Sequence, residues 1–347
     1  MNPFTCAIVG ATGMVGGMFI KILEERKLPI STLYPLASAR SAGKTVQFNG
    51  QPVTIEELTP QSFDRGIDIA LFAVDDETSR IYAPIAAKKG CVVIDNSAAW
   101  RMDASVPLVV PEVNGSDIAN NNGIIANPNC CAAPTVIALK PLQDAYGLDR
   151  VVISTYQSVS GAGVEGIRDL DVTIQGQEKS FFPYTIAHNL IPHIGSFDET
   201  GYTGEEIKLM AEIQKMLHQP TLKITATTVR VPVYTGHSLS INVSLKTPFE
   251  MKDIRRVLET APGVILYDNP ERNIYPMPIT ATGNDNVYIG RLRPDKSCEN
   301  GLNMWVVTDN TRKGAATNAV QVLEQVLTKE ALINNGQLHH NKRKSNR

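Results

Sequence analysis

A cysteine at position 130 stands where a thiol can act as a nucleophile. It lies in the stretch IIANPNCCAAPT, between an apolar run typical of a buried strand and a stretch with helical spacing. The first turn of a helix offers unpaired N–H groups and a positive dipole, which favour thiolate over thiol. The same N–H groups, with the Asn129 side chain, can hold the oxyanion that forms when a thiolate attacks a carbonyl. We therefore interpret Cys130 as a nucleophile. Buried cysteine is usually inert packing, which is our expectation for three others: Cys6, Cys91 and Cys131.

A proton donor and acceptor for such a thiol is most often histidine, of which the chain has six. His237 follows a glycine at the start of an alternating apolar run, and Arg230 stands on the run before it. The planar guanidinium of Arg230 can hold a carboxylate through two parallel N–H bonds. From the residues alone, His237 is one candidate beside His188 and His193, and a structural histidine is the alternative reading.

A glycine-rich loop, GATGMVG at residues 10–16, follows the first apolar run directly and opens a helical pattern. Backbone without side chains can approach a pyrophosphate there, and the helix N-terminus supplies N–H donors. The spacing is GxxGxxG and not the commoner GxGxxG, so a glycine-rich turn without a ligand is the alternative.

The segment LASARSAG, at residues 36–43, favours one nicotinamide cofactor over the other. An NAD site usually has an acid at the end of the second strand to bond the ribose 2′-hydroxyl, and this segment has none. Arg40 can pair with a 2′-phosphate, and Ser38 or Ser41 can donate hydrogen bonds to it. The segment therefore predicts NADP, with a solvated surface arginine as the alternative.

The elements that would position these residues follow two patterns. In the first third, short apolar runs at 5–9, 32–37, 67–74, 91–95 and 124–127 alternate with helical spacing at 14–27 and 79–89. This rhythm is typical of a doubly wound parallel sheet. After a helix that ends near residue 146, the strands lengthen and partly alternate, at 151–160, 222–233, 238–246, 287–293 and 302–308. Such strands indicate a mixed or antiparallel sheet with one covered face.

We predict an α/β fold: an N-terminal doubly wound (Rossmann) parallel sheet plus an α+β catalytic and dimerisation domain with a mixed sheet. The NADP-binding domain is expected at 1–130. A last helical pattern at 314–328 should return to it, in a C-terminal helix expected to span 314–332. The second domain is expected at 131–313. Residues 334–347 are polar and basic without apolar period, and we expect a disordered tail.

Composition excludes several classes of protein. The net charge of −2 over 347 residues argues against a nucleic-acid or membrane-surface partner. No apolar run is long enough to span a bilayer, and no signal peptide is recognisable. Five scattered cysteines without CxxC spacing indicate a reducing cytoplasm, with neither a metal site nor disulfides.

Eight motifs occur in an order and spacing that identify a resemblance: GATGMVG, SARSAGK, DNSAAWR, NPNC, STYQSVSGAG, GEEIK, RVPVYTGHS and WVVTDNTRKGAA. From about residue 4 to 332 the chain resembles aspartate-semialdehyde dehydrogenase of the bacterial type. The resemblance implies NADPH-dependent reduction of aspartyl β-phosphate to aspartate β-semialdehyde with release of phosphate. It implies a place in lysine (diaminopimelate), methionine and threonine biosynthesis.

The resemblance also implies residue roles. It makes Cys130 the thioester-forming nucleophile, His237 the general acid/base and Gln157 the residue that orients the acyl-enzyme. The carboxylate clamp, the ammonium partner and the two phosphate-binding cations would be Arg230, Glu205, Lys208 and Arg101. The cofactor contacts would be Gly10, Thr12, Gly13, Met14, Val15, Ser38, Arg40, Ser41, Ser160, Gly161 and Asn310. Gln157 and Glu205 have no support apart from the resemblance.

The second domain has few helices to cover both faces of its sheet, so we expect a homodimer, with a homotetramer as the alternative. Between residues 163 and 188 the chain is shorter than many relatives, in a segment that often helps to form the subunit interface. Three other functions compete. N-acetyl-glutamyl-phosphate reductases typically have Gly before the nucleophile and Tyr after it, where this chain has Asn129 and Cys131. A thiol hydrolase or acyltransferase would leave the glycine-rich loop without purpose, and a regulatory cofactor-binding protein would leave Cys130 and His237 without purpose.

Overall fold

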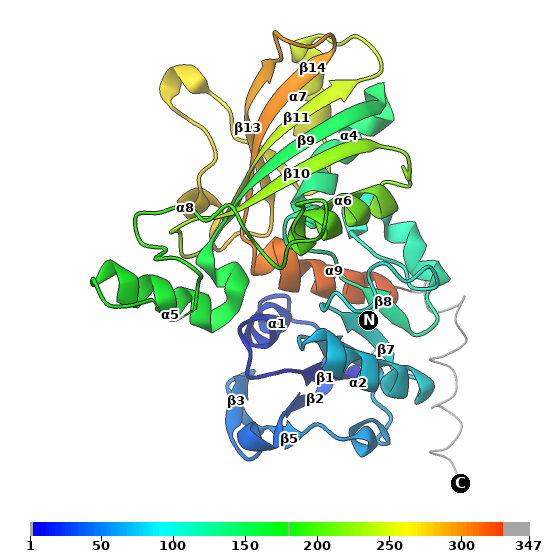
Figure 1. Ribbon diagram of the computed structural model, residues 1–347. Helices are drawn as coiled ribbons and strands as arrows, with labels where there is room; N and C mark the ends of the chain where they lie inside the picture. The colour runs from blue at the N-terminus through cyan, green and yellow to red at the C-terminus, as the bar shows by residue number, and fades with distance from the viewer. Residues whose placement is uncertain (1–2, 180, 329–347) are drawn as a thin grey trace. The chain divides into compact units, whose positions relative to one another are not determined.

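A computed structural model describes residues 3–179 and 181–328 (Figure 1). The chain divides into two compact units. The first unit comprises the described residues up to Pro128 and from Ala315 onward, and the second unit comprises Asn129–Gly314. The tail predicted at 334–347 lies outside the described residues, as do residues 329–332 of the predicted C-terminal helix.

The first unit is built on a six-stranded sheet in which every strand pairs parallel to its neighbours, in the order β5-β2-β1-β6-β7-β8. Its strands are β1 (Phe4–Val9), β2 (Ile30–Ala37), β5 (Glu56–Glu57), β6 (Ile69–Phe72), β7 (Val92–Asp95) and β8 (Ile124–Ala126). Its α-helices are α1 (Met14–Glu25), α2 (Asp76–Lys88), α3 (Pro111–Asn114) and α9 (Thr317–Val326). A separate hairpin pairs β3 (Thr45–Phe48) with β4 (Gln51–Thr54).

Alternate residues of the central strands are buried on opposite faces of this sheet. Ile69 and Leu71 of β6 share one core with α1 and α9. On the other face, Asp95 of β7 accepts a hydrogen bond from Ser79 of α2. A parallel sheet with helices on both faces is doubly wound, so this part of the predicted fold is confirmed.

The second unit contains a mixed six-stranded sheet in the order β10-β9-β11-β14-β13-β12, which confirms the predicted sheet type. The central pairs are antiparallel and the two edge strands pair parallel. The strands are β9 (Leu148–Gln157), β10 (Lys223–Arg230), β11 (His237–Leu245), β12 (Val264–Leu266), β13 (Val287–Pro294) and β14 (Gly301–Thr308). The α-helices are α4 (Ala132–Tyr146), α5 (Gly163–Ile174), α6 (Gly204–Met216), α7 (Met251–Glu259) and α8 (Pro278–Ala281).

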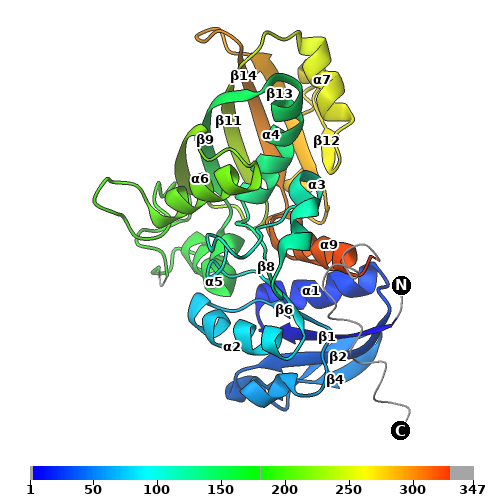
Figure 2. The ribbon, with the colours of Figure 1, turned by 90° about the vertical axis from the view of Figure 1, so that its right-hand side faces the viewer.

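Helices α4, α6 and α7 lie on one face of the second sheet, where α4 packs between the other two (Figure 2). On the opposite face, alternate side chains of the central strands are partly exposed. Tyr156 of β9 packs on Trp305 of β14 with ring centroids 5.4 Å apart, and both line a surface pocket with Ser240 of β11. Trp305 also packs in a small core with Ala281 of α8, and its Nε1 donates to the carbonyl of Pro276 at 3.1 Å, so this face carries aromatic side chains that are only partly covered.

Element ends differ from the prediction where turns intervene. The strand predicted at 151–160 ends at Gln157, because the chain enters the 3₁₀ turn Val159–Ala162 and the N–H groups of Val159 and Ser160 donate to carbonyls of residues 233 and 234. The sequence pattern did not indicate α5, whose first turns contain glycine. The last helix is preceded by a π-helical turn over Arg312–Ala316. Within the described residues, no helix combines the length and apolar character that a membrane crossing requires.

Candidate active site

Cys130 lies in the turn just before α4, and its side chain is partly exposed. Its sulfur, the sulfur of Cys131 and a ring nitrogen of His237 all lie within 4.8 Å of one another. A hydrogen bond from the Cys131 thiol, and then the charges of His237 and Arg230, hold the pKa of Cys130 well below its ordinary value, although burial opposes this. A lowered pKa of Cys130 agrees with the prediction. Its cause differs, because neighbouring side chains lower the pKa where we expected the N-terminus of the helix to do so.

Cys131 behaves in the opposite way. It is fully buried, and burial is the main reason why its pKa lies well above the ordinary value. A protonated thiol can donate a hydrogen bond to a neighbouring thiolate. Cys131 is buried, as expected for a packed thiol, and it also lies beside the candidate nucleophile.

His237 begins β11 and is fully buried. Its Nδ1 accepts a hydrogen bond from the backbone N–H of Ser158 at 3.1 Å. Because a backbone N–H can only donate, the neutral ring carries its proton on Nε2. Among the described residues that Nε2 finds no hydrogen-bond partner, so it is available to a ligand.

Arg230 ends β10 and is 5% exposed. Its Nη1 donates to the carbonyl of Ser158 at 2.7 Å, and its guanidinium carbon lies 5.9 Å from the ring centroid of Phe182. Burial lowers the pKa of Arg230. Its Nε has no partner among the described residues. A buried guanidinium with an unused N–H can bind an anionic group of a ligand.

Gly161 lies directly against both of these side chains. A Cβ at this position would stand 2.8 Å from Nη1 of Arg230 and 3.1 Å from Nε2 of His237. A side chain would therefore crowd the guanidinium of Arg230 and the unsatisfied Nε2 of His237. The resemblance implies that Gly161 contacts the cofactor. The structure shows that Gly161 also lies beside Arg230 and His237.

Helix α6 brings an acid to the same cluster. Its N-terminus is fixed by a capping box between Thr203 and Glu206. One oxygen of Glu205 accepts from the Nδ2 of Asn129 at 2.9 Å and from the Nε2 of Gln157 at 3.2 Å. Lys208, one turn further along the helix, is exposed. The structure thus brings Glu205 and Gln157 together beside the nucleophile turn.

Glu212, which the sequence analysis missed, also supports that turn. It is 1% exposed, and its Oε2 accepts the N–H of Asn129 at 2.6 Å. The available signal was an acid in the buried stripe of α6, next to Ile213. The Oδ1 of Asn129 accepts the N–H of Cys131 at 2.7 Å. That N–H is therefore already used, which removes one of the donors expected for an oxyanion.

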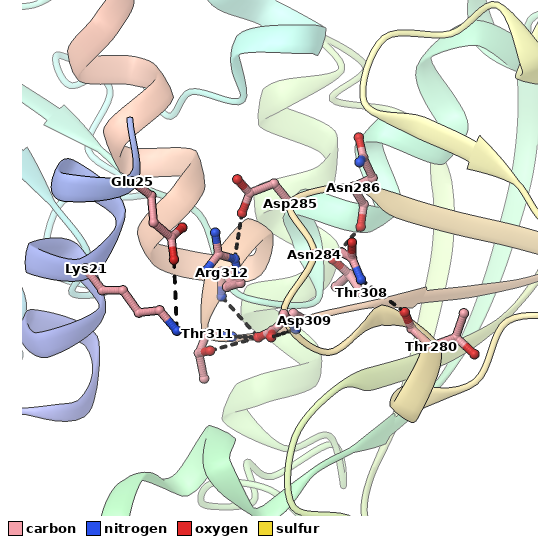
Figure 3. Close-up of polar contacts among 11 residues, drawn as sticks. Lys21, Glu25, Thr280, Asn284, Asp285, Asn286, Thr308, Asp309, Thr311 and Arg312 are labelled. Carbon is pink, nitrogen blue, oxygen red and sulfur yellow. Dashed lines mark hydrogen bonds and ion pairs between the residues drawn. The ribbon is translucent and has the colours of Figure 1, made fainter. Parts of the chain in front are cut away.

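Asn310 and Ser160 lie in a buried network next to His237. The Oδ1 of Asn310 accepts the N–H of Gly236 at 2.9 Å, and its Nδ2 donates to Ser160 at 3.0 Å. The neighbouring Asp309 shapes this loop, because it accepts the N–H groups of Thr311 and Arg312 (Figure 3). The same view shows Arg312 paired with Asp285 at 2.8 Å.

The glycine-rich loop of the first unit connects β1 to α1 and lines a surface pocket with Gly10, Thr12, Gly13 and Ser38. Gly10 has a φ of +89°, and a Cβ there would stand 2.2 Å from the carbonyl oxygen of Ala73. Only glycine permits this approach to β6. Two other predicted cofactor contacts form the first turn of α1: Met14 and Val15.

Arg40 and Ser41 lie on the 3₁₀ turn after β2, the arginine exposed and the serine buried. The sequence analysis found no acid near this end of β2. The structure corrects this: Glu57 of β5 pairs with Ala37 in the sheet and lines the same pocket. Local sequence patterns do not indicate that Glu57 lies near Ala37, because the pairing of β2 with β5 joins residues that are 20 positions apart in the chain.

Arg101 belongs to the first unit and is 9% exposed. Its Nε donates to the carbonyl of Asn127 at 2.9 Å, and its Nη2 donates to the carbonyl of Asn96 at 2.8 Å. These bonds hold the guanidinium against the end of β8. His188 and His193, the other histidine candidates, have exposed and half-buried side chains respectively outside the cluster around Cys130.

Two stretches of the chain match described families. Residues 5–121 match "Semialdehyde dehydrogenase, NAD binding domain", and residues 139–313 match "Semialdehyde dehydrogenase, dimerisation domain". The aspartate-semialdehyde dehydrogenase of Aquifex aeolicus is 52% identical over 339 residues, which cover 95% of this chain and 99% of that protein. The Bacillus subtilis enzyme is 45% identical over 337 residues, 92% of this chain and 96% of that protein.

A crystal structure of aspartate semialdehyde dehydrogenase II from Vibrio cholerae superposes with a TM-score of 0.90 at 43% identity. The match covers 94% of this chain and 98% of that one. Both domains and nearly the full length thus agree with one group of enzymes, which confirms the resemblance that the motifs indicated. The chain belongs to the aspartate-semialdehyde dehydrogenase family.

Proposed function

We propose that this protein is an NADPH-dependent reductase that converts aspartyl β-phosphate to aspartate β-semialdehyde and phosphate through a thioester on Cys130. The observation that carries the proposal is the cluster around Cys130: a thiol with a lowered pKa lies beside a ring nitrogen of His237 and within the electrostatic influence of Arg230, and Nε2 of His237 and Nε of Arg230 have no hydrogen-bond partner among the described residues. A nucleophile, a proton carrier and an anion site are the three groups that this reaction needs.

Cys130 attacks the β-carbonyl as a thiolate, forms the C–S bond and expels phosphate. The hydrogen bond from Cys131 lowers the pKa of this thiol and so favours the thiolate. The hydride that reduces the thioester carbonyl would come from NADPH when it is bound. Collapse of the thiohemiacetal breaks the C–S bond and releases the aldehyde, and His237 exchanges the proton with the substrate oxygen through its Nε2.

Recognition of the substrate follows from charge. The Arg230 guanidinium holds the α-carboxylate, and Glu205 receives the ammonium group. Arg101 and Lys208 bind the phosphate that leaves. Gln157, which donates to Glu205 at 3.2 Å, orients the acyl group.

We assign the cofactor as NADP. The residues of the first unit fit a dinucleotide, because Gly10 leaves open backbone next to the N-terminus of α1. Arg40 pairs with the 2′-phosphate, and Ser38 and Ser41 donate to it. Glu57 opposes this preference, since a carboxylate in the same pocket repels a phosphate and can accept from a ribose hydroxyl. Ser160, Gly161 and Asn310 complete the cofactor contacts.

The product would feed lysine (through diaminopimelate), methionine and threonine biosynthesis. A catalytic thiolate requires reducing surroundings, so the enzyme is assigned to the cytoplasm. The relative from Vibrio cholerae is described in complex with ASA, and we assign aspartate semialdehyde as this enzyme's product. Residues 1–130 with the C-terminal helix bind NADP, and 131–313 carry catalysis and the contact of a homodimer.

The reverse reaction tests the proposal. Purified protein should reduce NADP with aspartate semialdehyde only when phosphate is present, because phosphate must cleave the thioester. Absence of turnover, or turnover that does not depend on phosphate, would refute it. N-acetyl-glutamate semialdehyde, offered in the same assay, should react poorly.

A further inference from the structure

Ser158 presents two different groups to the same nitrogen of His237. It follows β9, is fully buried, and donates its backbone N–H to Nδ1 at 3.1 Å. Its hydroxyl oxygen lies 3.0 Å from that Nδ1. A backbone N–H can only donate, whereas a hydroxyl can donate or accept. The two groups therefore suit different protonation states of the ring.

The hydroxyl of Ser158 is held on its other side by Asn310. Its oxygen donates to the Oδ1 of Asn310 at 3.1 Å. That Oδ1 is itself fixed by the N–H of Gly236 at 2.9 Å, the residue immediately before His237. Asn310 is 4% exposed, so its carbonyl is a rigid acceptor in a site without bulk water.

The cationic form of the His237 ring needs a hydrogen-bond acceptor for its Nδ1–H, and the Ser158 hydroxyl can be that acceptor. In the neutral ring, Nδ1 accepts from the N–H of Ser158. In the cation, Nδ1 carries a proton that requires an acceptor, and the N–H of Ser158 cannot provide one. The Ser158 hydroxyl can accept a hydrogen bond from it while donating its own hydrogen bond to the Oδ1 of Asn310. Leaving a buried N–H⁺ without this acceptor would strongly disfavour the cation.

We propose that Ser158, held by Asn310, is a positioning residue that allows His237 to gain and lose its catalytic proton without turning its ring. This inference rests on the proposed function, in which His237 accepts a proton in the reverse reaction. Cys130 and Cys131 from the start of α4 and Arg230 from β10 are the titratable groups that face the ring. All three remain in a variant that lacks only the hydroxyl, so a comparison isolates its effect.

The test is Ser158→Ala, which removes the hydroxyl and keeps the backbone N–H. A hydrogen bond to a charged group corresponds to a loss of about ten- to a hundred-fold. We expect kcat of the reverse reaction to fall by that factor, with KM for aspartate semialdehyde within about twofold. The NMR titration midpoint of the His237 ring, assigned by its loss in His237→Asn, should move to lower pH by about one to two units. Ser158→Thr, which restores a hydroxyl, should recover much of both.

The matched control is Ser244→Ala, a buried serine of β11 whose hydroxyl contacts Cys298 at 3.3 Å. It should leave kcat and the midpoint unchanged. A folded Ser158→Ala whose midpoint stays in place or rises overturns the proposal. Should Ser158→Ala fail to fold, Asn310→Ala must lower the midpoint, and an unchanged value there also overturns it. If wild-type protein does not turn over, the proposed function fails, while the titration still tests Ser158.

Discussion

Two adjacent cysteines differ in chemistry because their surroundings differ. Cys130 faces cationic and donor groups that lower its pKa, whereas Cys131 lies in a fully buried position where desolvation raises its pKa. The surroundings favour the thiolate at Cys130 and the neutral thiol at Cys131. At the scale of the residue, function therefore depends on neighbours within hydrogen-bond reach, and each of these neighbours can be removed singly.

The lowered pKa of Cys130 can be tested through the pH dependence of its alkylation. A thiol with a depressed pKa stays ionised, and therefore reactive, as the pH falls below the ordinary thiol value of about 8.5. Alkylation of Cys130 by iodoacetamide should stay fast below that pH. Cys131→Ala removes the main hydrogen bond that stabilises the thiolate, so the pH at which the alkylation rate is half-maximal should rise.

Cys130→Ser should abolish turnover while NADP affinity persists. Cys298→Ala, at an exposed thiol, should change neither turnover nor NADP affinity. A Cys131 variant with an unchanged alkylation profile would contradict this account.

Cofactor choice at the end of β2 rests on opposed charges. Arg40→Glu should weaken NADPH by about ten-fold or more, since a charge-assisted contact is lost, and should affect NADH far less. Glu57→Gln should act in the opposite direction and tighten NADPH. Fluorescence titration with both cofactors measures the two ratios. Equal NADPH affinity in wild type and Arg40→Glu would exclude a 2′-phosphate contact at Arg40.

Strands and turns determine how accurately the reacting groups meet. β10 ends with Arg230, β11 begins with His237, and the turn after β9 places Gly161 against both. These elements belong to one hydrogen-bonded sheet, in which β9 pairs with β10 and with β11. Rigid strands therefore fix the separation of two side chains that approach the ligand from different segments.

Arg230→Lys tests that geometry with the charge retained. The guanidinium is anchored by its bond to the Ser158 carbonyl, and its planar fork fixes both the position and the rotation of a carboxylate. A lysine ammonium on a flexible stem allows misplacement, and about 1 Å can cost on the order of a hundred-fold in rate. KM for aspartate semialdehyde should rise and kcat should fall, with KM for NADP unchanged. Wild-type kinetics would show that Arg230 does not clamp the carboxylate.

The second unit as a whole has a sheet with one face under α4, α6 and α7 and another face that carries the Tyr156–Trp305 pair. Partly exposed aromatic side chains on a sheet face are typical of subunit interfaces. The matching family description names this region a dimerisation domain. We predicted a homodimer because the second domain has few helices to cover both faces of its sheet, and the partly exposed face supplies a direct test.

Sedimentation equilibrium at micromolar concentration should give a dimer, or a tetramer of twice its mass. Trp305→Arg should shift the protein toward monomer, because a charge would be buried without a partner. The control is Ile81→Arg, a change at an apolar residue of α2 that is already 51% exposed, which should not alter the mass. A stable wild-type monomer would refute the dimer.

Local sequence patterns predict most of the helices and strands and part of the local chemistry. Apolar period and turn residues act over a few positions, so they were sufficient to predict the parallel and mixed sheets, the glycine-rich loop before α1, and the position of Cys130 before α4. The resemblance added residues such as Gln157 and Glu205, which no local pattern distinguishes from ordinary polar side chains.

Which side chains contact one another depends on how distant segments fold together. Ser158 meets His237 across 79 positions of the chain, and Glu212 reaches Asn129 across 83. Glu57 joins the cofactor pocket through a strand pairing, and the two cysteines meet His237 because α4 and β11 pack against each other. Hydrogen bonds act over about 3 Å, so their partners depend on how distant segments pack. No local sequence pattern specifies that packing.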